Sequence, residues 1–382
     1  MVNRLITKEI EKSKKSILLI GPRQIGKSTL MRALRPDLTI NLAKENEFLR
    51  YSANADLFLE QIEGTNVKLV LIDEVQRIPG LLNSVQALID EAKGKRQLRF
   101  LITGSSARKL RRGKANLLPG RVLSYELGGL CAREVNYKVD LSRALKYGFL
   151  PEPFLESSSR QTEKLLQSYS AIYLKEEIQA EALLRNIQGF ARFLLVLGAA
   201  AGQVLDFSKL STKAKVSRTS SLRFAEILED TLIAQRIYSF EGASGAEIIK
   251  HPKLYFFDIG VLNGLLNNFV VSEDRKGMLF EQLIYSQLRN SAMAHDLPIK
   301  IQFFRTRHGL EVDFIITLRN EIWAIEVKSG DATEQDLKGL RAFRDYCSEV
   351  KHLVLVTPKD KKRIKDGILI CDWITLLKEM GF

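Results

Sequence analysis

The sequence predicts an α/β protein in which a parallel sheet flanked by helices is followed by a mainly helical region and then by a second α/β part. Three observations lead to this prediction. Residues 1–135 alternate short apolar segments with helical patterns, which is typical of a parallel sheet. Residues 136–271 are mostly helical in pattern, and residues 272–382 return to alternating strands and helices. We therefore expect three domains with these boundaries.

The first part contains five short apolar runs with helical patterns between them. In a parallel sheet with helices on both faces, ligands bind at the carboxyl ends of the strands. The predicted strands are 16–21, 38–42, 67–73, 98–103 and 121–126.

The first predicted strand runs into a loop with the spacing G-x-x-x-x-G-K-[ST], filled by Gly21, Gly26, Lys27 and Ser28. Glycines let such a backbone wrap closely around phosphates, with amide N–H groups facing the negative charge. Lys27 is expected to reach the β- and γ-phosphates, and Ser28 to ligate Mg²⁺. The segment predicted to bind ATP comprises Gly21, Pro22, Arg23, Gln24, Ile25, Gly26, Lys27, Ser28 and Thr29.

A second motif follows the predicted strand at residues 69–72, which ends in Asp73 and Glu74. We expect Asp73 to hold Mg²⁺, directly or through water, and Glu74 to polarise the attacking water. A hydroxyl at the end of the next strand, Ser105 or Thr103, is expected to sense the γ-phosphate. A glycine turn before an ordinary helix and a solvated strand end are the plainer interpretations, but they leave the two motifs' joint occurrence unexplained.

The net charge of +13 and the pI of about 9.5 favour a polyanionic partner. Two basic clusters stand out, and solvated loops are the alternative interpretation of each. The first comprises Arg108, Lys109, Arg111, Arg112 and Lys114, and the second Lys359, Lys361, Lys362, Arg363 and Lys365.

Composition also limits the location and the kinds of site. Cys131, Cys347 and Cys371 have no CxxC spacing, which argues against a disulfide or zinc framework. Residues 1–16 are charged and lack the apolar segment of a signal peptide. The most apolar later stretch, 193–201, is too short to span a bilayer. We expect a cytoplasmic protein without a membrane partner.

In the second part, three helical segments precede two strand-like pieces, the order of a winged helix-turn-helix. Its turn would be residues 215–217, with Ser217 or Thr219 capping the third helix and placing Arg218 and Arg223 near its exposed side. In DNA-binding versions this helix enters the major groove. Many such domains bind proteins instead, and acidic and basic residues nearly balance here, so both roles stay open. The segments are 187–201, 207–214, 217–230, 232–238 and 254–257, after a longer helical region that includes 165–184.

The third part is expected to hold a helix at 277–290, strands at 301–305, 311–318 and 322–328, a helix at 333–346, a strand at 352–357, and a terminal strand and helix. Asp313 and the pair Glu326-x-Lys328 would lie on adjacent antiparallel strands. Glu326 and Lys328 share a face because strand side chains repeat every two residues.

These side chains match the needs of a Mg²⁺-dependent phosphodiesterase. Carboxylates hold hard cations through oxygen, and the metal generates the nucleophile. We expect Asp313, Glu326 and Lys328 to be catalytic, and Glu281, Asp313 and Glu326 to be metal ligands. An E-x-K element also occurs by chance, as at 91–93, so a silent or structural site is the open alternative.

Together, the motifs resemble those of prokaryotic AAA-type P-loop ATPases whose nucleotide domain is followed by a domain related to restriction endonucleases, of the PD-(D/E)xK type. The resemblance covers nearly the whole chain. It implies ATP hydrolysis at Lys27, Ser28, Asp73 and Glu74, a winged-helix middle, and an endonuclease-like core. The matching segments are 21–29, 72–76, 102–107, 118–121, 253–260, 311–314 and 325–328.

Three functions follow from these motifs. The first is a Mg²⁺-dependent ATPase whose hydrolysis drives the attached domains, acting on DNA or another nucleic acid. The others are an ATP-regulated DNA endonuclease and a slow ATP switch in signalling or scaffolding. A homo-oligomer is a further expected partner state, and Arg121 is either a γ-phosphate or neighbour-contacting arginine or part of a surface salt bridge.

Overall fold

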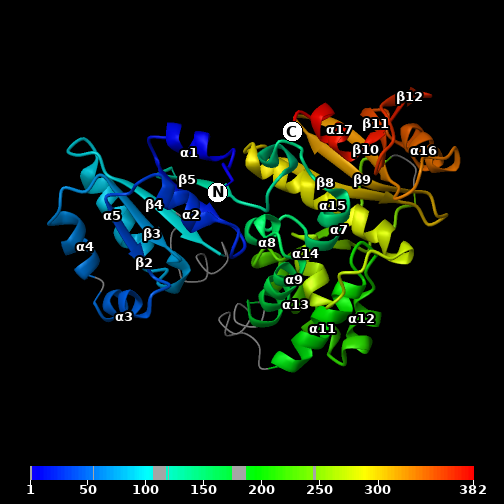
Figure 1. Cartoon of the computed structure of the whole chain (residues 1–382). Coiled ribbons are helices and arrows are strands. Elements are labelled where there is room, and N and C mark those ends of the chain that lie inside the picture. Colours follow the sequence, from blue (N-terminus) through cyan, green and yellow to red (C-terminus); the bar gives the residue numbers. More distant parts are fainter. Residues whose placement is uncertain (1, 55, 106–117, 119, 174–185, 244–246) are drawn as a thin grey trace. The chain divides into compact units, whose positions relative to one another are not determined.

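The structure is a computed structural model of the chain, and it describes all residues except 1, 55, 106–117, 119, 174–185 and 244–246 (Figure 1). It contains two compact units. One comprises Met1–Gly128 with Asp230–Leu232, and the other comprises Gly129–Glu229 with Ile233–Phe382. The second unit thus includes most of the second and third ranges expected from the sequence, and the three-domain division stays a prediction.

The first unit is built on a five-stranded sheet in the order β2-β3-β4-β1-β5, and every pairing in it is parallel. The predicted parallel sheet is confirmed. The central strands β3, β4 and β1 are almost fully buried, whereas the edge strands β2 and β5 are partly exposed. Its strands are β1 (Ser16–Ile20), β2 (Leu38–Asn41), β3 (Leu69–Asp73), β4 (Arg99–Gly104) and β5 (Val122–Glu126).

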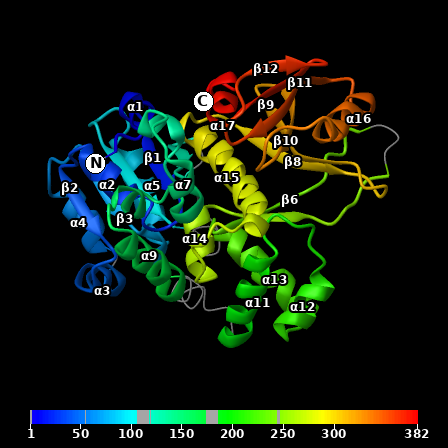
Figure 2. The same cartoon turned by 45° about the vertical axis from the view of Figure 1, so that its right-hand side comes forward.

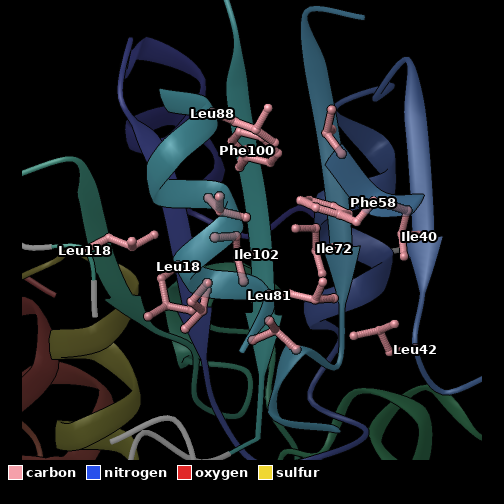
Figure 3. Close-up of a cluster of buried hydrophobic side chains, with 14 of the residues drawn as sticks. Leu18, Ile40, Leu42, Phe58, Ile72, Leu81, Leu88, Phe100, Ile102 and Leu118 are labelled. Atoms are coloured by element: carbon pink, nitrogen blue, oxygen red, sulfur yellow. The ribbon is translucent and has the colours of Figure 1, made fainter. Parts of the chain in front are cut away.

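Helices pack against this sheet, and a hydrophobic core lies between the helices and the strands. Figure 3 shows Phe58 of α4 and Leu81 and Leu88 of α5 near strand residues such as Ile72 and Phe100, all of them buried. Removing this apolar surface from water stabilises the sheet against its helices. The helices are α1 (Thr7–Lys12), α2 (Lys27–Ala33), α3 (Glu45–Ala53), α4 (Asp56–Glu63) and α5 (Leu81–Ala92), with the 3₁₀ turn η1 (Val75–Arg77).

The second unit begins with helices and a small antiparallel pair. The helical region expected to include 165–184 contains a helix over Ser159–Ser168. Ser158 caps this helix by accepting a hydrogen bond from the Gln161 N–H, and residues 174–184 lie outside the described residues. The elements are η2 (Ala132–Val135), α7 (Leu141–Tyr147), α8 (Pro151–Leu155), α9 (Ser159–Ser168), the π-helical η3 (Tyr169–Tyr173), α11 (Ile187–Ala199), α12 (Phe207–Ala214), α13 (Arg218–Asp230), β6 (Ala234–Ile237), β7 (Lys253–Phe256) and α14 (Ile259–Leu265).

The turn between α12 and α13 forms where the sequence predicts it. Lys215 adopts a left-handed conformation, and the Ser217 hydroxyl accepts a hydrogen bond from the Ser220 N–H at 3.0 Å. Arg218 and Arg223 are exposed, as expected. The order of three helices followed by the antiparallel pair β6–β7 is also as expected, while the winged-helix assignment stays a prediction.

A mixed six-stranded sheet completes the second unit, in the order β12-β13-β11-β10-β9-β8 (Figure 2). β9 and β10 are antiparallel as predicted, with Phe314 opposite Ile325. The edge strand β12 was not predicted, because its side chains are exposed and give no apolar pattern. The elements are α15 (Glu273–Ala294), β8 (Ile299–Arg305), β9 (Glu311–Leu318), β10 (Glu321–Val327), η4 (Gln335–Leu337), α16 (Lys338–Tyr346), β11 (Val350–Thr357), β12 (Arg363–Lys365), β13 (Ile368–Asp372) and α17 (Trp373–Glu379).

Candidate functional site

The loop between β1 and α2 has a shape that depends on its two motif glycines. Gly26 has φ +95°, a conformation that side chains with a Cβ rarely adopt. A Cβ atom at Gly21 would lie 2.3 Å from the Leu127 carbonyl oxygen, which is closer than any real contact. The backbone of the loop therefore strongly favours glycine at both positions.

Lys27 is held inside this loop. Its side chain is 4% exposed, and its ammonium donates to the carbonyl oxygens of Gly21 and Pro22 at 2.8 Å each. These carbonyls pair with the ammonium and keep it within the loop. The cation thus lies where the sequence predicts the phosphates to bind.

Arg4 supports the same loop from the N-terminal segment, a role that sequence reasoning missed. Its guanidinium is buried and donates to the Ile25 carbonyl oxygen at 2.9 Å and to the Gly128 carbonyl oxygen at 2.8 Å. An arginine in a charged N-terminal stretch carries no signal for this contact, which joins positions more than a hundred residues apart in the sequence. It fixes the loop by binding its backbone.

Asp73 gathers the hydroxyls of two neighbouring elements. Its Oδ1 accepts hydrogen bonds from Ser28 Oγ at 2.7 Å and from Thr103 Oγ1 at 2.5 Å. Its Oδ2 pairs with the Arg32 guanidinium at 3.1 Å, which offsets the cost of burying the carboxylate. A serine hydroxyl beside a carboxylate supplies the oxygen ligands that Mg²⁺ prefers, so these residues fit the predicted ion.

Glu74 and Ser105 are joined by Gln76, which sequence reasoning also missed. The Gln76 amide donates to Glu74 Oε2 and to Ser105 Oγ, the latter at 3.0 Å. Its carbonyl oxygen accepts from the Ser105 N–H at 3.3 Å. The Glu74 N–H in turn donates to Thr103 Oγ1 at 3.1 Å. The candidate base and both candidate sensor hydroxyls therefore belong to one hydrogen-bonded network.

The other cations named from the sequence have ordinary surroundings where they are described. Arg121 makes a two-pronged salt bridge to Asp90, at 2.7 and 2.9 Å, which is the plainer of its two interpretations. The first basic cluster lies outside the described residues. Four members of the second pair with acids: Lys359 with Asp331, Lys362 with Glu379, Arg363 with Asp360 and Lys365 with Glu334.

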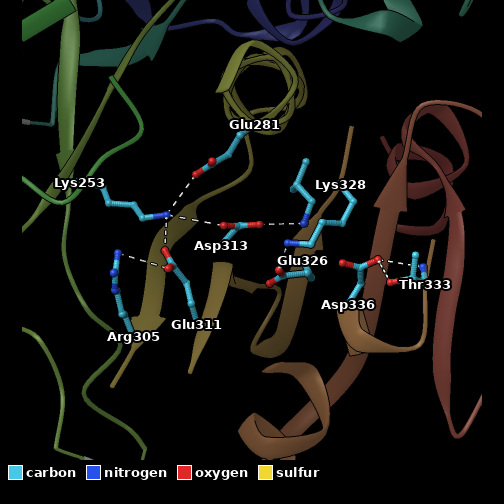
Figure 4. A network of polar contacts seen from close by, with 10 residues as sticks. Lys253, Glu281, Arg305, Glu311, Asp313, Glu326, Lys328, Thr333 and Asp336 are labelled. Carbon is cyan, nitrogen blue, oxygen red and sulfur yellow. Dashed lines mark hydrogen bonds and ion pairs between the residues drawn. The ribbon is translucent and has the colours of Figure 1, made fainter. Parts of the chain in front are cut away.

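A second constellation lies in the second unit, where the predicted residues come together from three elements (Figure 4). Glu281 extends from α15, Asp313 from β9 and Glu326 from β10. Continuing the β9–β10 register by one residue places Asp313 opposite Glu326, and Asp313 Oδ2 accepts from the Val327 N–H at 2.9 Å. The Lys328 ammonium lies 2.5 Å from Glu326 Oε1, so these two side chains lie on the same side, as their spacing predicts.

Lys253, the first residue of β7, lies among these carboxylates and was missed as a site residue. Its side chain is 3% exposed. Its ammonium lies 2.9 Å from Glu311 Oε1, 3.2 Å from Glu281 Oε1 and 3.6 Å from Asp313 Oδ1. The one available signal was a lysine directly before the apolar run 254–257, which is an unusual place for a charge that stays in solvent.

Burial and crowding of like charges alter the protonation of this constellation. Burial, and then the nearby Asp313, raises the pKa of Glu281 to about 7. Burial and Asp313 likewise raise the pKa of Glu326 to about 8, against the opposing effect of Lys328. Burial lowers the pKa of Lys253, but the surrounding carboxylates raise it by more, so its pKa lies above the ordinary value and the ammonium stays charged.

As arranged, the constellation is complementary to an ammonium. Within the described part of the chain, no three His, Cys, Asp or Glu side chains are placed to hold a metal ion together. Glu326 Oε2 is buried and has no hydrogen-bond partner among the described residues. The metal-ligand role of Glu281, Asp313 and Glu326 therefore stays a prediction.

Comparison with known proteins identifies the first domain. Residues 13–136 match the model of an AAA domain (AAA_14). Residues 138–271 and 276–374 match two domains of unknown function, DUF8612 and DUF4143. The first match supports an AAA-type, nucleotide-binding P-loop ATPase domain. The third match does not support the nuclease-like assignment of the C-terminal part.

Two solved structures are among those similar to this chain. "Replication initiator DnaA bound to AMPPCP and single-stranded DNA" is 11% identical, covers 59% of this chain and 86% of its own, and has a TM-score of 0.28. Protein VC1899 from Vibrio cholerae is 13% identical, covers 96% and 93% respectively, and has a TM-score of 0.19. No curated protein matches the chain significantly.

None of the helices in the described residues has both the length and the apolar character needed to cross a membrane.

Proposed function

We propose that the N-terminal unit binds ATP with Mg²⁺ and hydrolyses it, and that the nucleotide state changes the conformation of the rest of the chain. One observation carries the proposal. Ser28 Oγ lies 2.7 Å from Asp73 Oδ1, at the end of a loop that holds the Lys27 ammonium. This arrangement gives one oxygen cluster for a hard cation and one positive charge for phosphates. The AAA-domain match over the same residues supports it.

Each residue of this site has a definite task in the proposed reaction. The backbone of residues 21–29 wraps the phosphates, and Lys27 exchanges its two carbonyl partners for phosphate oxygens. Ser28 and Asp73 would hold Mg²⁺, which neutralises phosphate charge when bound. Glu74 orients the attacking water and accepts its proton.

The Gln76 amide sets the orientation of the Glu74 carboxylate and links it to the Ser105 hydroxyl. Thr103 contacts both Asp73 and the Glu74 N–H. A phosphate that forms a hydrogen bond with the Thr103 or Ser105 hydroxyl would therefore change the position of Glu74. This network supports a sensor role for both hydroxyls, the two alternatives that the sequence left open.

Replacing Lys27 with Ala in the full-length chain tests the nucleotide site. Tight ATP binding should be lost, because the substitution removes the cation that the loop holds for the β- and γ-phosphates. Titration calorimetry with ATP and Mg²⁺ measures this, and Lys8→Ala, an exposed lysine of α1, is the matched control. Equal ATP affinity in the Lys27 variant and the wild-type protein would remove the assignment.

The proposed binding partner of the chain is a nucleic acid, on which the conformational change would act. The net charge of +13 favours this partner. Exposed Arg218 and Arg223 on α13 add positive charge to the helix that would enter a groove. Binding to duplex DNA should weaken with salt, with a logarithmic slope of about −0.9 per contacted phosphate. Replacing Arg108, Lys109, Arg111 and Arg112 by Ser should flatten that slope. Absence of DNA and RNA binding at low salt would favour a protein partner and the switch function.

The endonuclease alternative rests on the convergence of Glu281, Asp313, Glu326 and Lys328. It receives less support than the ATPase, because three of the surrounding carboxylates already pair with Lys253. A DNA cleavage assay with Mg²⁺ or Mn²⁺, comparing the wild-type chain with Asp313→Asn, separates the two functions. Cleavage that Asp313→Asn abolishes while ATP hydrolysis continues would establish the nuclease.

A further inference from the structure

Lys253 is a buried cation at the centre of an acidic site, and its surroundings differ from those of a simple salt bridge. Three carboxylate oxygens from two elements converge on one ammonium, at 2.9, 3.2 and 3.6 Å. A salt bridge that served only packing would need one partner, since each additional buried charge costs desolvation energy. The arrangement resembles a cation and its ligands, with the cation supplied by the chain (Figure 4).

A second observation indicates that the site is built for positive charge. Glu326 is 7% exposed, and its Oε2 is buried with no hydrogen-bond partner among the described residues. An orphaned carboxylate oxygen is costly in a protein interior. Four carboxylates meet here: Glu281, Glu311, Asp313 and Glu326. The described cations that pair with them are Lys253, Lys328 and Arg305.

We propose that Lys253 is a tethered cation that occupies the divalent-ion position of this cluster, so that the wild-type chain excludes a divalent ion from Glu281, Glu311 and Asp313. A hard divalent ion needs carboxylate oxygens at about 2.0–2.6 Å, and these oxygens instead surround the ammonium. The ammonium also repels an incoming cation at close range, in a buried setting where charge interactions are strong. This inference does not depend on the proposed ATPase function.

The exclusion explains two features together. The carboxylates expected from the sequence do converge, but within the described residues they form no metal-holding group. Lys253 lies on β7, directly before the segment that leads into α14, whereas Glu311 and Asp313 lie on β9. The lysine therefore ties two parts of the second unit together by the same contacts that fill the cation position.

Mn²⁺ titration of the full-length chain tests the proposal without any assay of activity. Asp73→Asn is introduced as the background and nucleotide is omitted, so that the N-terminal site does not contribute. The parent should show no saturable Mn²⁺ binding by calorimetry. Lys253→Met, which keeps the length of the side chain and removes its charge, should show saturable Mn²⁺ binding that the parent lacks. Adding Asp313→Asn to this variant should abolish the gain.

Lys328→Met is the matched control, because it removes an equal charge from the same cluster but leaves Lys253 in place. A gain in the control as large as in Lys253→Met would overturn the proposal, since the effect would then be one of general charge. Saturable binding by the parent that Asp313→Asn abolishes would also overturn it. Lys253→Arg keeps the charge and should not bind Mn²⁺. If circular dichroism shows that Lys253→Met does not fold, saturable Mn²⁺ binding by Lys253→Arg would contradict the proposal.

Discussion

Replacing Arg4 with Met should loosen the loop between β1 and α2 while keeping most of the apolar stem of the side chain. The wild-type guanidinium donates to the carbonyl oxygens of Ile25 and Gly128 at 2.9 and 2.8 Å, and it is buried. Hydrogen bonds from charged donors contribute about 1.5–3 kcal/mol each. Because two such bonds on one side chain are not additive, we expect a loss of about 3 kcal/mol from the first unit.

Thermal unfolding of the full-length chain measures this loss, with ATP titration by calorimetry as the second readout. The unfolding transition of the first unit should shift to lower temperature. ATP affinity should fall by about tenfold or more, because binding must then also order the loop. Arg4→Lys should give an intermediate result, since one ammonium reaches the two carbonyls less well than a guanidinium does.

Arg50→Met is the matched control, because Arg50 is an exposed arginine of α3 in the same unit. It should leave both measurements unchanged within about 0.5 kcal/mol. If Arg4→Met matched this control in stability and in ATP affinity, the contact to Ile25 would have no role in shaping the loop and the reasoning would be refuted.

Three further predictions concern hydrolysis, loop shape and pH. Glu74→Gln should retain ATP binding and lose about 10²–10⁴ in hydrolysis rate, because the amide cannot accept the proton; wild-type turnover in a phosphate-release assay would show that the base lies elsewhere. Gly21→Ala should abolish ATP binding, because its Cβ would lie 2.3 Å from the Leu127 carbonyl oxygen, whereas Gly80→Ala, with nothing within 4 Å of its Cβ, is the neutral control; similar calorimetric affinities in both would contradict the model of the loop. Burial and Asp313 raise the pKa of Glu281 to about 7 and that of Glu326 to about 8, so the folded state binds more protons than the unfolded state above the ordinary carboxyl range. The stability of the second unit should therefore fall as pH rises from about 5 to about 8, and Glu326→Gln should reduce that slope in unfolding experiments; stability that rises over this window in the wild-type chain would show that the carboxyls are not the groups responsible.

Elements with a strong local pattern were predicted closely. The five strands of the first sheet appear within a few residues of their expected ranges. Three of them, β1, β3 and β4, are almost fully buried, and such parallel strands have nearly continuous apolar sequences. Elements without such a pattern were missed. The edge strand β12 carries exposed charged residues, and α14 begins at a buried cap, Asp258, which accepts a hydrogen bond from the Val261 N–H. Neither feature is visible in hydrophobic periodicity.

The candidate residues of the first site follow from local spacing. Gly21, Gly26, Lys27 and Ser28 lie within one loop, so the chain's own geometry brings them together wherever the loop forms. Asp73 required one further step, the rule that parallel strands end at a common edge. No such rule predicts the contacts of Arg4, Arg32 and Gln76, because tertiary packing determines which groups lie beside them.

The sequence by itself determined the α/β class and the placement of Asp313 and Glu326 on adjacent antiparallel strands, and it predicts the phosphate-loop residues, because each of these depends on spacing within a strand, a loop or one hairpin. Only the tertiary structure decided that Lys253 meets Glu281, Glu311 and Asp313. The lysine lies 28 residues from Glu281 in the sequence and on a different element. Its charge is buried only because the surrounding carboxylates stabilise it, and that balance exists only once β7, β9 and α15 have packed together.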